Sequence, residues 1–512
     1  MKRQQPDLTQ MIGMGSGEAQ DQRVETEILE PASVSQNQAT FLLPQKGLLS
    51  ADAFLSFKMT TVSTDVDIPL IAGATGLIRR ASIYYGNVLL QETDQAAHLL
   101  QLKSTYVDQD VRNQTYQTKT GHFSGLKVDA NANGKLGMYS IDAANDDTGI
   151  VGLTTLDAAA VADPLNYGKD PAFTLGTTEA DTPEWTIPLT WFFNWLSQTQ
   201  VPLGLLNERI SIVFDFNEDL PGMRSVISDP PGANNPWQAG TLVVESSVRL
   251  SLDLIYYDDQ PGKPSPMAAI AAALEKGMEM VYTDYVCVEE FIPGLAAAPA
   301  APQNTQKIVR LGLDHQVCRN ILIATPKQSD YTVVTPQGFS NPILGDYNSR
   351  ASTGQRTLQV KINNQNLYVN AIDMDCKLWN ELSQVQATPM KANIGFTSAV
   401  GQLAATAALD YDIDQQAFPD DKFIYGHPQG GVWGGAENNS TFSGALAYMG
   451  VNLSRTYDNV LGAGTNISKS PVEIELNYTR TNQNWRQLRM LMWCENERLM
   501  MMKNGTIYVS GS

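Results

Sequence analysis

The chain has 512 residues, of which 43% are apolar and 17% charged, and its formal net charge is −19. This acidic balance excludes nucleic-acid binding as the main role, because that role needs a basic surface to neutralise phosphates. Four cysteines exclude a disulfide-built scaffold and indicate a reducing compartment, and the length is enough for two or three domains.

The first 35 residues are polar and rich in glutamine, and they predict an N-terminal arm, residues 1–35, that a partner orders. No apolar run of the kind found in a secretory signal follows Lys2 and Arg3, so we expect no signal peptide. The longest helix-compatible apolar stretch covers only 267–274, whereas a membrane span needs about 20 residues. We therefore expect no transmembrane helix.

Short strand patterns dominate the rest of the chain. A period of two with one polar face is typical of antiparallel strands that are buried on one side. Three segments show this alternation clearly: 209–216, 248–256 and 472–479. Three others favour a short helix: 95–104, 189–197 and 375–385. This balance predicts an all-β protein with a few short helices.

The midpoint of the chain has the composition of a linker. Residues 258–266 include three prolines, which a central strand does not tolerate, and an alanine-rich helix is predicted at 267–278. The halves on either side are each about the size of one large β-sandwich. The predicted order is the arm, a first sandwich at 36–258, a linker with a short helix at 259–280, and a second sandwich at 281–512.

The two halves also resemble each other. Each contains a strand, a tight turn of asparagine or glycine, a second strand and a predicted helix, at 83–100 in the first half and 360–379 in the second. Asn87 lies 12 residues before Leu99, and Asn366 lies 12 residues before Leu378. Two matching units in separate halves predict a duplicated fold.

Both halves carry a long insertion between predicted strands. Residues 128–184 hold ten acidic residues against Lys135 and Lys169 and supply −8 of the net charge, and residues 387–444 are rich in glycine, alanine, glutamine and asparagine. Loops of this length in a compact domain are usually functional or disordered. We expect the rigid sandwiches to display them as an exposed surface.

The motifs that mark common enzymes are missing, and we predict no catalytic, cofactor-binding or metal-binding residue. Gly13, Gly15 and Gly17 lack the ending of a phosphate-binding loop and are interpreted as part of the arm. The four histidines have no second ligand at metal spacing, and the Asp-x-Asp pairs are interpreted as solvated turns rather than calcium sites. These residues are His98, His122, His315 and His427, and Asp65/Asp67, Asp373/Asp375 and Asp410/Asp412/Asp414.

Aromatic, asparagine and cysteine side chains receive structural interpretations as well. The tryptophans are expected in the core, except Trp433 in a glycine-rich loop, which could stack on a sugar. The Asn-x-Ser/Thr sequons are interpreted as products of composition, and Cys494 as a small buried apolar residue. The residues concerned are Trp185, Trp191, Trp195, Trp237, Trp379, Trp433, Trp485 and Trp493, and Asn113, Asn438, Asn439, Asn452, Asn466, Asn477 and Asn504.

Taken together, these features resemble the double jelly-roll major capsid proteins of DNA viruses, of the polinton-like virus, virophage and nucleocytoplasmic large DNA virus type. The segments 187–193 and 201–212 look like a Pro-Leu helix that leads through a second Pro-Leu into the next strand. The segments 471–476, 489–492 and 504–509 look like the close of the second jelly roll. The resemblance implies two tandem eight-stranded antiparallel jelly-roll sandwiches with short helices and long loop insertions.

The resemblance also implies a function and partners. It implies a homotrimer of pseudo-hexagonal outline that tiles an icosahedral shell, with the arm on the inner face. The implied partners are neighbouring capsomers, penton and minor capsid proteins, and an inner membrane or genome-side proteins reached by the arm. Sequence-specific nucleic-acid binding is not implied. The expected location is the virion, assembled inside the host cell.

Two other classes of protein remain open at this stage. An acidic β-sandwich protein that hydrolyses or binds polysaccharide could use paired carboxylates and exposed tryptophans. Such a protein is usually secreted, and we expect no signal peptide here. A tail or adhesin protein would show fibrous repeats, and the sequence has none.

Overall fold

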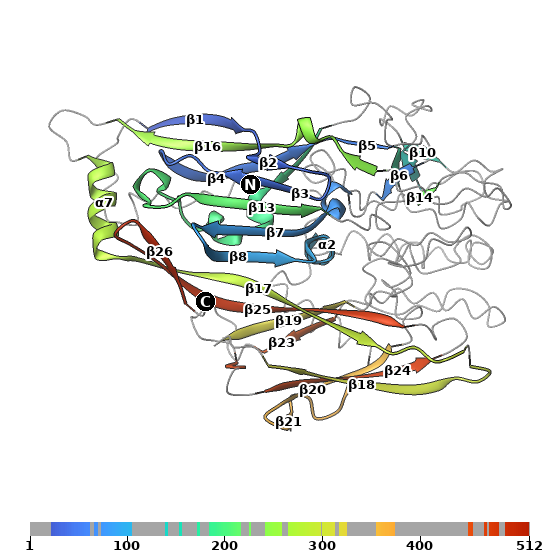
Figure 1. Cartoon of the computed structure of the whole chain (residues 1–512). Coiled ribbons are helices and arrows are strands. Elements are labelled where there is room, and N and C mark those ends of the chain that lie inside the picture. Colours follow the sequence, from blue (N-terminus) through green and yellow to red (C-terminus); the bar gives the residue numbers. More distant parts are fainter. Residues whose placement is uncertain are drawn as a thin grey trace.

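The computed structural model of the chain is built from two antiparallel β-sandwiches joined by a helix (Figure 1). No helix among the residues that the structure describes is long and apolar enough to cross a membrane. The structure describes residues 22–61, 66–69, 73–104, 139–141, 153–155, 172–174, 184–216, 225–226, 241–258, 265–297, 299–312, 317–324, 355–373, 449–453, 465–467, 471–480 and 487–510.

The first sandwich consists of two sheets, ordered β1-β16-β4-β12 and β2-β3-β13-β7-β8. The strands of the first sheet are β1 (Gln22–Leu29), β4 (Leu48–Phe57), β12 (Trp185–Pro188) and β16 (Arg249–Tyr257). Those of the second sheet are β2 (Ser33–Val34), β3 (Gln38–Leu42), β7 (Ile78–Tyr85), β8 (Val88–Asp94) and β13 (Ile210–Phe216). The predicted strands at 209–216 and 248–256 are confirmed as β13 and β16.

Strand β13 shows how the alternating sequence makes the core. Ile210, Ile212, Phe214 and Phe216 are buried, and the residues between them are half-buried. The ring of Phe214 contacts Phe41 edge-on, with centroids 6.2 Å apart. Strand β13 pairs with both β3 and β7 and is therefore a central strand of its own sheet. Its Phe216 ring contacts Phe57 of β4 in the opposing sheet, with centroids 6.3 Å apart, so the apolar face of β13 lies between the two sheets.

The predicted arm differs from the structure over residues 22–35. Strand β1 pairs along its whole length with β16, from Gln22 opposite Tyr257 to Leu29 opposite Leu250. Strand β2 pairs in turn with β3. Residues 22–35 therefore belong to the first sandwich rather than to an arm. The sequence hides β1 because an edge strand exposes apolar residues such as Val24 and Ile28. Residues 1–21 lie outside the described residues.

The second sandwich repeats this arrangement, with sheets ordered β17-β25-β19-β23 and β18-β24-β20-β21. Two short strands extend them, β26 (Thr506–Val509) beside β25 and β22 (Ile372–Asp373) beside β20. The others are β17 (Met278–Ile292), β18 (Gln303–Leu311), β19 (Cys318–Ala324), β20 (Gln355–Ile362), β21 (Gln365–Asn366), β23 (Met449–Asn452), β24 (Val472–Arg480) and β25 (Leu488–Lys503). Strand β24 confirms the predicted strand at 472–479, and β17 begins inside the predicted linker segment 259–280.

The predicted duplication corresponds to matching hairpins, β7–β8 and β20–β21. The first turns at Gly86 and Asn87, where Gly86 has φ +54°. The second turns at Asn363 and Asn364, with φ +52° and +63°. Left-handed backbone of this kind favours glycine and asparagine, which explains the turn chemistry. The matching turn thus lies two residues before Asn366, the position that the sequence comparison aligned with Asn87.

Three of the predicted helices are described, and they differ in form. Helix α2 (Ala96–Ser104) follows β8 as predicted. The segment 189–197 divides into α6 (Leu189–Phe192) and the 3₁₀ turn η4 (Asn194–Ser197), because Phe193 between them leaves the helical region. Helix α7 (Pro266–Lys276) connects the sandwiches, capped by Ser265 and ended by Gly277 at φ +98°.

The sequence predicts an irregular insertion at 128–184, but the structure places three short strands in it. They are β9 (Tyr139–Ile141), β10 (Leu153–Thr155) and β11 (Ala172–Thr174), and they join a sheet with β6 (Val66–Pro69) and β14 (Ser225–Val226). A further pair is formed by β5 (Met59–Thr61) and β15 (Thr241–Val243). The predicted helix 375–385 and loop 387–444 lie outside the described residues.

Candidate functional site at the junction and outer faces of the sandwiches

The two sandwiches meet where β8 of the first lies beside β17 of the second (Figure 1). Three side chains donate hydrogen bonds across this junction to backbone carbonyls. Tyr282 Oη donates to the oxygen of Leu90 at 2.6 Å, and Gln91 Nε2 donates to the oxygen of Thr283 at 3.0 Å. The indole Nε1 of Trp493 donates to the oxygen of Asp94 at 3.1 Å. Specific polar contacts therefore fix one sandwich against the other.

Strand β25 carries the apolar part of the junction. Met490, Met492 and Cys494 point into the core of the second sandwich, which confirms the prediction for Cys494. Leu491 and Trp493 alternate with them and are fully buried as well. Trp493 is buried as predicted, whereas the burial of Leu491 and the contact of this face with the first sandwich were not predicted. The signal was the unbroken apolar run 490–494, which indicates a strand buried on both faces.

The C-terminal hairpin β25–β26 makes a second contact with the first sandwich. The carbonyl oxygen of Gly505 accepts hydrogen bonds from Tyr85 Oη at 2.7 Å and from the backbone of Asn207 at 2.9 Å. Asn207 Nδ2 also donates to the oxygen of Asn504 at 2.8 Å. The apolar residues beside this hairpin belong to the core of the first sandwich: Met500, Met502, Ile507 and Val509. One continuous core thus crosses the domain boundary.

Gly505 is needed at this contact for two reasons. Its φ is +72°, and an added Cβ would lie 2.7 Å from the oxygen of Leu205 and 2.8 Å from Asn207 Oδ1. We expect Gly505→Ala to lower the free energy of unfolding by about 3 kcal/mol through backbone strain and this steric conflict. Gly312→Ala is the control, because a Cβ there meets nothing within 4 Å. Urea denaturation of both variants measures the difference, and equal midpoints would contradict the role of Gly505.

Two charged groups are buried close to the junction, on the neighbouring strands β17 and β25. Asp284 Oδ2 pairs with Arg498 Nε at 2.9 Å, and Asp284 is almost inaccessible to solvent. Burial raises the pKa of Asp284 to about 6, although the nearby Arg498 acts in the opposite direction. Burial also raises the pKa of Tyr282 far above its usual range. Desolvation thus outweighs pairing at this position.

Because the pKa of Asp284 is raised in the folded state, protonation of this one carboxyl group should increase the free energy of unfolding. Between pH 4 and 6 the folded state binds the proton more tightly than the unfolded state, so stability falls as pH rises through this range. A shift of two pKa units corresponds to about 3 kcal/mol. We expect the unfolding free energy of the unsubstituted chain, minus that of Asp284→Asn, to increase as pH falls from 7 to 4. Urea titrations at several pH values measure this difference, and a difference that stays constant would contradict the assignment.

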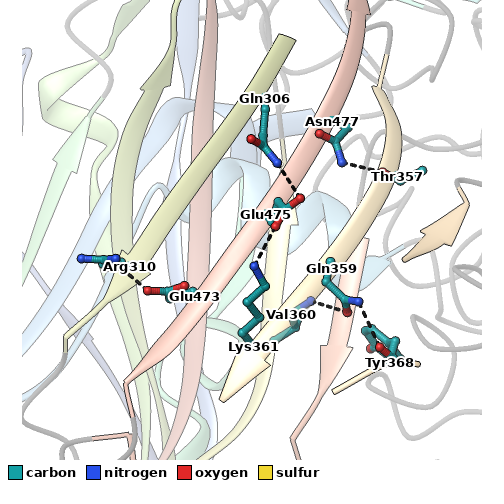
Figure 2. A network of polar contacts seen from close by, with 10 residues as sticks. All are labelled: Gln306, Arg310, Thr357, Gln359, Val360, Lys361, Tyr368, Glu473, Glu475 and Asn477. Atoms are coloured by element: carbon teal, nitrogen blue, oxygen red, sulfur yellow. Dashed lines mark hydrogen bonds and ion pairs between the residues drawn. The ribbon is translucent and has the colours of Figure 1, made fainter. Parts of the chain in front are cut away.

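The outward face of the β18–β24–β20 sheet carries a network of polar side chains (Figure 2). Glu473 pairs with Arg310 at 2.7 Å. Glu475 accepts from Lys361 at 3.0 Å and from Gln306 at 2.5 Å, and these contacts lower its pKa. The two glutamates are thus neutralised by cations on the flanking strands. They do not form the unpaired acid and base that a glycoside hydrolase needs.

The structure places the predicted histidine and cysteine residues in structural positions where it describes them. His98 on α2 is buried, and burial lowers its pKa to about 3, so it is uncharged at neutral pH. Cys318 is buried and Cys287 is half-buried. Burial raises the pKa of the Cys287 thiol, and a hydrogen bond with Cys494 together with burial raises the pKa of the Cys318 thiol. The described residues contain no group of three metal-ligating side chains. His122, His315, His427, Asp65, Asp375, Asp410, Asp412, Asp414 and Cys376 lie outside the described residues, and the side chains of Asp67 and Asp373 are not described.

The described tryptophans belong to the core, as predicted. Trp185, Trp195 and Trp493 are buried, and Trp191 packs half-buried against the first core. The described sequon residues Asn452, Asn466 and Asn477 are half-buried, and Asn504 is exposed in the β25–β26 turn. The remaining candidates lie outside the described residues: Trp237, Trp379, Trp433, Trp485, Asn113, Asn438 and Asn439.

The arrangement of the two sandwiches has counterparts among solved structures. The chain is similar to PBCV-1 VP54, fitted into a cryo-EM reconstruction of the virophage Sputnik, with a TM-score of 0.56, 10% identity, and 96% of this chain and 98% of that chain covered. It is also similar to a chain of the cryo-EM structure of the Sputnik virophage, with a TM-score of 0.55 and 13% identity. That match covers 96% of this chain and 89% of the Sputnik chain. The chain is similar to a quasi-atomic model of the PBCV-1 virus capsid as well, with a TM-score of 0.54 and 10% identity, and the match covers 96% of this chain and 98% of that chain. The chain has a double jelly-roll fold.

The double jelly-roll prediction is therefore confirmed at the level of the fold. The match covers nearly the whole length of both chains, so the two jelly rolls and their connection correspond together. No protein-family model and no curated protein matches the sequence. With identities of 10–13%, the similarity lies in strand order and layer packing rather than in particular side chains.

Proposed function

We propose that the chain is a viral major capsid protein that forms a homotrimer of pseudo-hexagonal outline and tiles an icosahedral shell. The observation that carries this proposal is the repetition of the same two-sheet order in both halves, with the halves fused through one continuous core. Three such chains supply six similar wedges, which pack on a near-hexagonal lattice. The similarity to PBCV-1 and Sputnik capsid structures supports the same role.

The chemistry of the described residues supports a structural rather than a catalytic role. The acidic side chains on the outward β24 face are paired with cations, and the described tryptophans are in the core. Within the described part of the chain, these side chains therefore provide neither the unpaired carboxylates of a polysaccharide hydrolase nor the exposed tryptophans of a lectin. The proposed location is the virion capsid, assembled in the host cell, with contacts to neighbouring capsomers, penton and minor capsid proteins, and to genome-side proteins or an inner membrane.

Negative-stain electron microscopy of the concentrated protein tests this proposal. We expect particles with a hexagonal outline that form flat or curved hexagonal arrays as concentration rises. Particles that remain single two-lobed molecules at every concentration, without arrays or shells, would refute the capsid role.

A further inference from the structure

The junction inside the chain provides a template for a contact between chains. Strand β17 is the edge strand of its sheet, just as β1 is the edge strand of the matching sheet in the first sandwich. Strands β8 and β21 correspond in the same way, because each is the edge strand that follows a matching hairpin turn. Inside the chain β8 packs against β17. Among the strands that the structure describes, the equivalent strands β21 and β1 do not pack against each other in this way.

These two unmatched edges lie at opposite ends of the molecule (Figure 1). We propose that β1 of one copy packs against β21 and the following residues 367–369 of the next copy, and this inference rests on the proposed homotrimer. A head-to-tail contact of this kind uses two different surfaces of one chain and closes into a ring when the rotation allows. The contact inside the chain and the contact between chains would then alternate around six sandwiches.

The equivalence identifies the residues that should make the contact. Leu90 and Gln91, which bond to β17, are the third and fourth residues after Asn87 of the first turn. The third and fourth residues after Asn364 of the second turn are Leu367 and Tyr368. Leu367 is exposed, and the next residue, Val369, is 94% exposed. An apolar side chain this exposed fits a surface that a partner covers.

The opposing edge has matching properties. Val24 and Ile28 point to the same side of β1 and are 55% and 62% exposed. The charges of β1 are neutralised within the copy, since Glu25 pairs with Arg23 at 3.2 Å and Glu27 with Lys46 at 2.9 Å. The hairpin segment 362–372 contains no charged residue at all. Apolar contact between the two edges therefore leaves no unpaired charge to bury.

Sedimentation velocity of Val369→Asp and Val24→Asp tests the contact. We expect both variants to lose the trimer peak and sediment as single chains, with unchanged far-ultraviolet circular dichroism because both side chains are exposed. Leu42→Asp is the matched control, since Leu42 is also an exposed apolar strand residue but lies on β3, away from both edges. It should remain trimeric.

A crosslinking experiment identifies the neighbours directly. Chains carrying Val369→Cys are mixed with chains carrying Val24→Cys, reassembled, and treated with a short bismaleimide, with the unsubstituted chain as background. We expect a covalent two-chain product only in the mixture. A trimer that tolerates both aspartates, or gives no such product, would overturn the inference and leave the proposed function standing. An unsubstituted chain that is monomeric throughout would overturn both.

Discussion

Replacing Trp493 with alanine is expected to lower the free energy of unfolding by about 4 kcal/mol, the usual range for deleting a fully buried tryptophan. Trp493 is inaccessible to solvent and lies where β25 faces the first sandwich. Its removal leaves a cavity at the junction and deprives the oxygen of Asp94 of a hydrogen bond. The lost contacts belong to both sandwiches, so the whole chain should become less stable.

Urea denaturation measures the effect of Trp493→Ala. Tyr508→Ala is the control, because Tyr508 on β26 is an exposed aromatic residue of the same sandwich and should change stability by less than about 0.5 kcal/mol. A loss at Trp493 no larger than that of the control would mean that the two sandwiches are not held by this contact.

Arg498→Ala is expected to cost a comparable amount, about 3–5 kcal/mol, because it leaves the buried carboxylate of Asp284 without its partner. The pKa of Asp284 is already raised to about 6 in the presence of the arginine, and it should rise further once the arginine is removed. Part of the loss should therefore be recovered below pH 6, where the carboxyl is protonated.

A double-mutant cycle separates the pair from its surroundings. We expect Asp284→Asn combined with Arg498→Met to be closer to the unsubstituted chain than Arg498→Ala alone, because the uncompensated charge is gone. Arg310→Ala is the control, since Arg310 is 78% exposed in its pair with Glu473 and should cost less than about 1 kcal/mol. Equal losses at Arg498 and Arg310 would contradict the importance of burial.

Particular elements show how far the sequence predicts this fold. Strands β13, β16 and β24 follow from alternation, because each is buried by one opposing sheet. Helix α7 follows from the proline-rich linker and its alanine-rich composition. The sequence predicts an arm where the structure has strand β1, because the apolar residues of β1 point to solvent in the single chain.

The junction was the main feature that sequence reasoning missed. Alternation reports burial by the partner sheet, whereas Leu491 and Trp493 are buried by a different sandwich far away in the sequence. Tyr282 and Gln91 likewise donate to carbonyl groups almost 200 residues away, and no local pattern encodes such contacts. The unbroken apolar run 490–494 was the one local sign that a second surface covers the strand.

We propose that three copies of this chain form the working unit. Light scattering of the purified protein behind a sizing column tests it most directly. We expect a stable species of about 168 kDa, three times the chain mass of 56.0 kDa, or larger hollow particles. A single species of 56.0 kDa that does not associate at high salt or high concentration would contradict it.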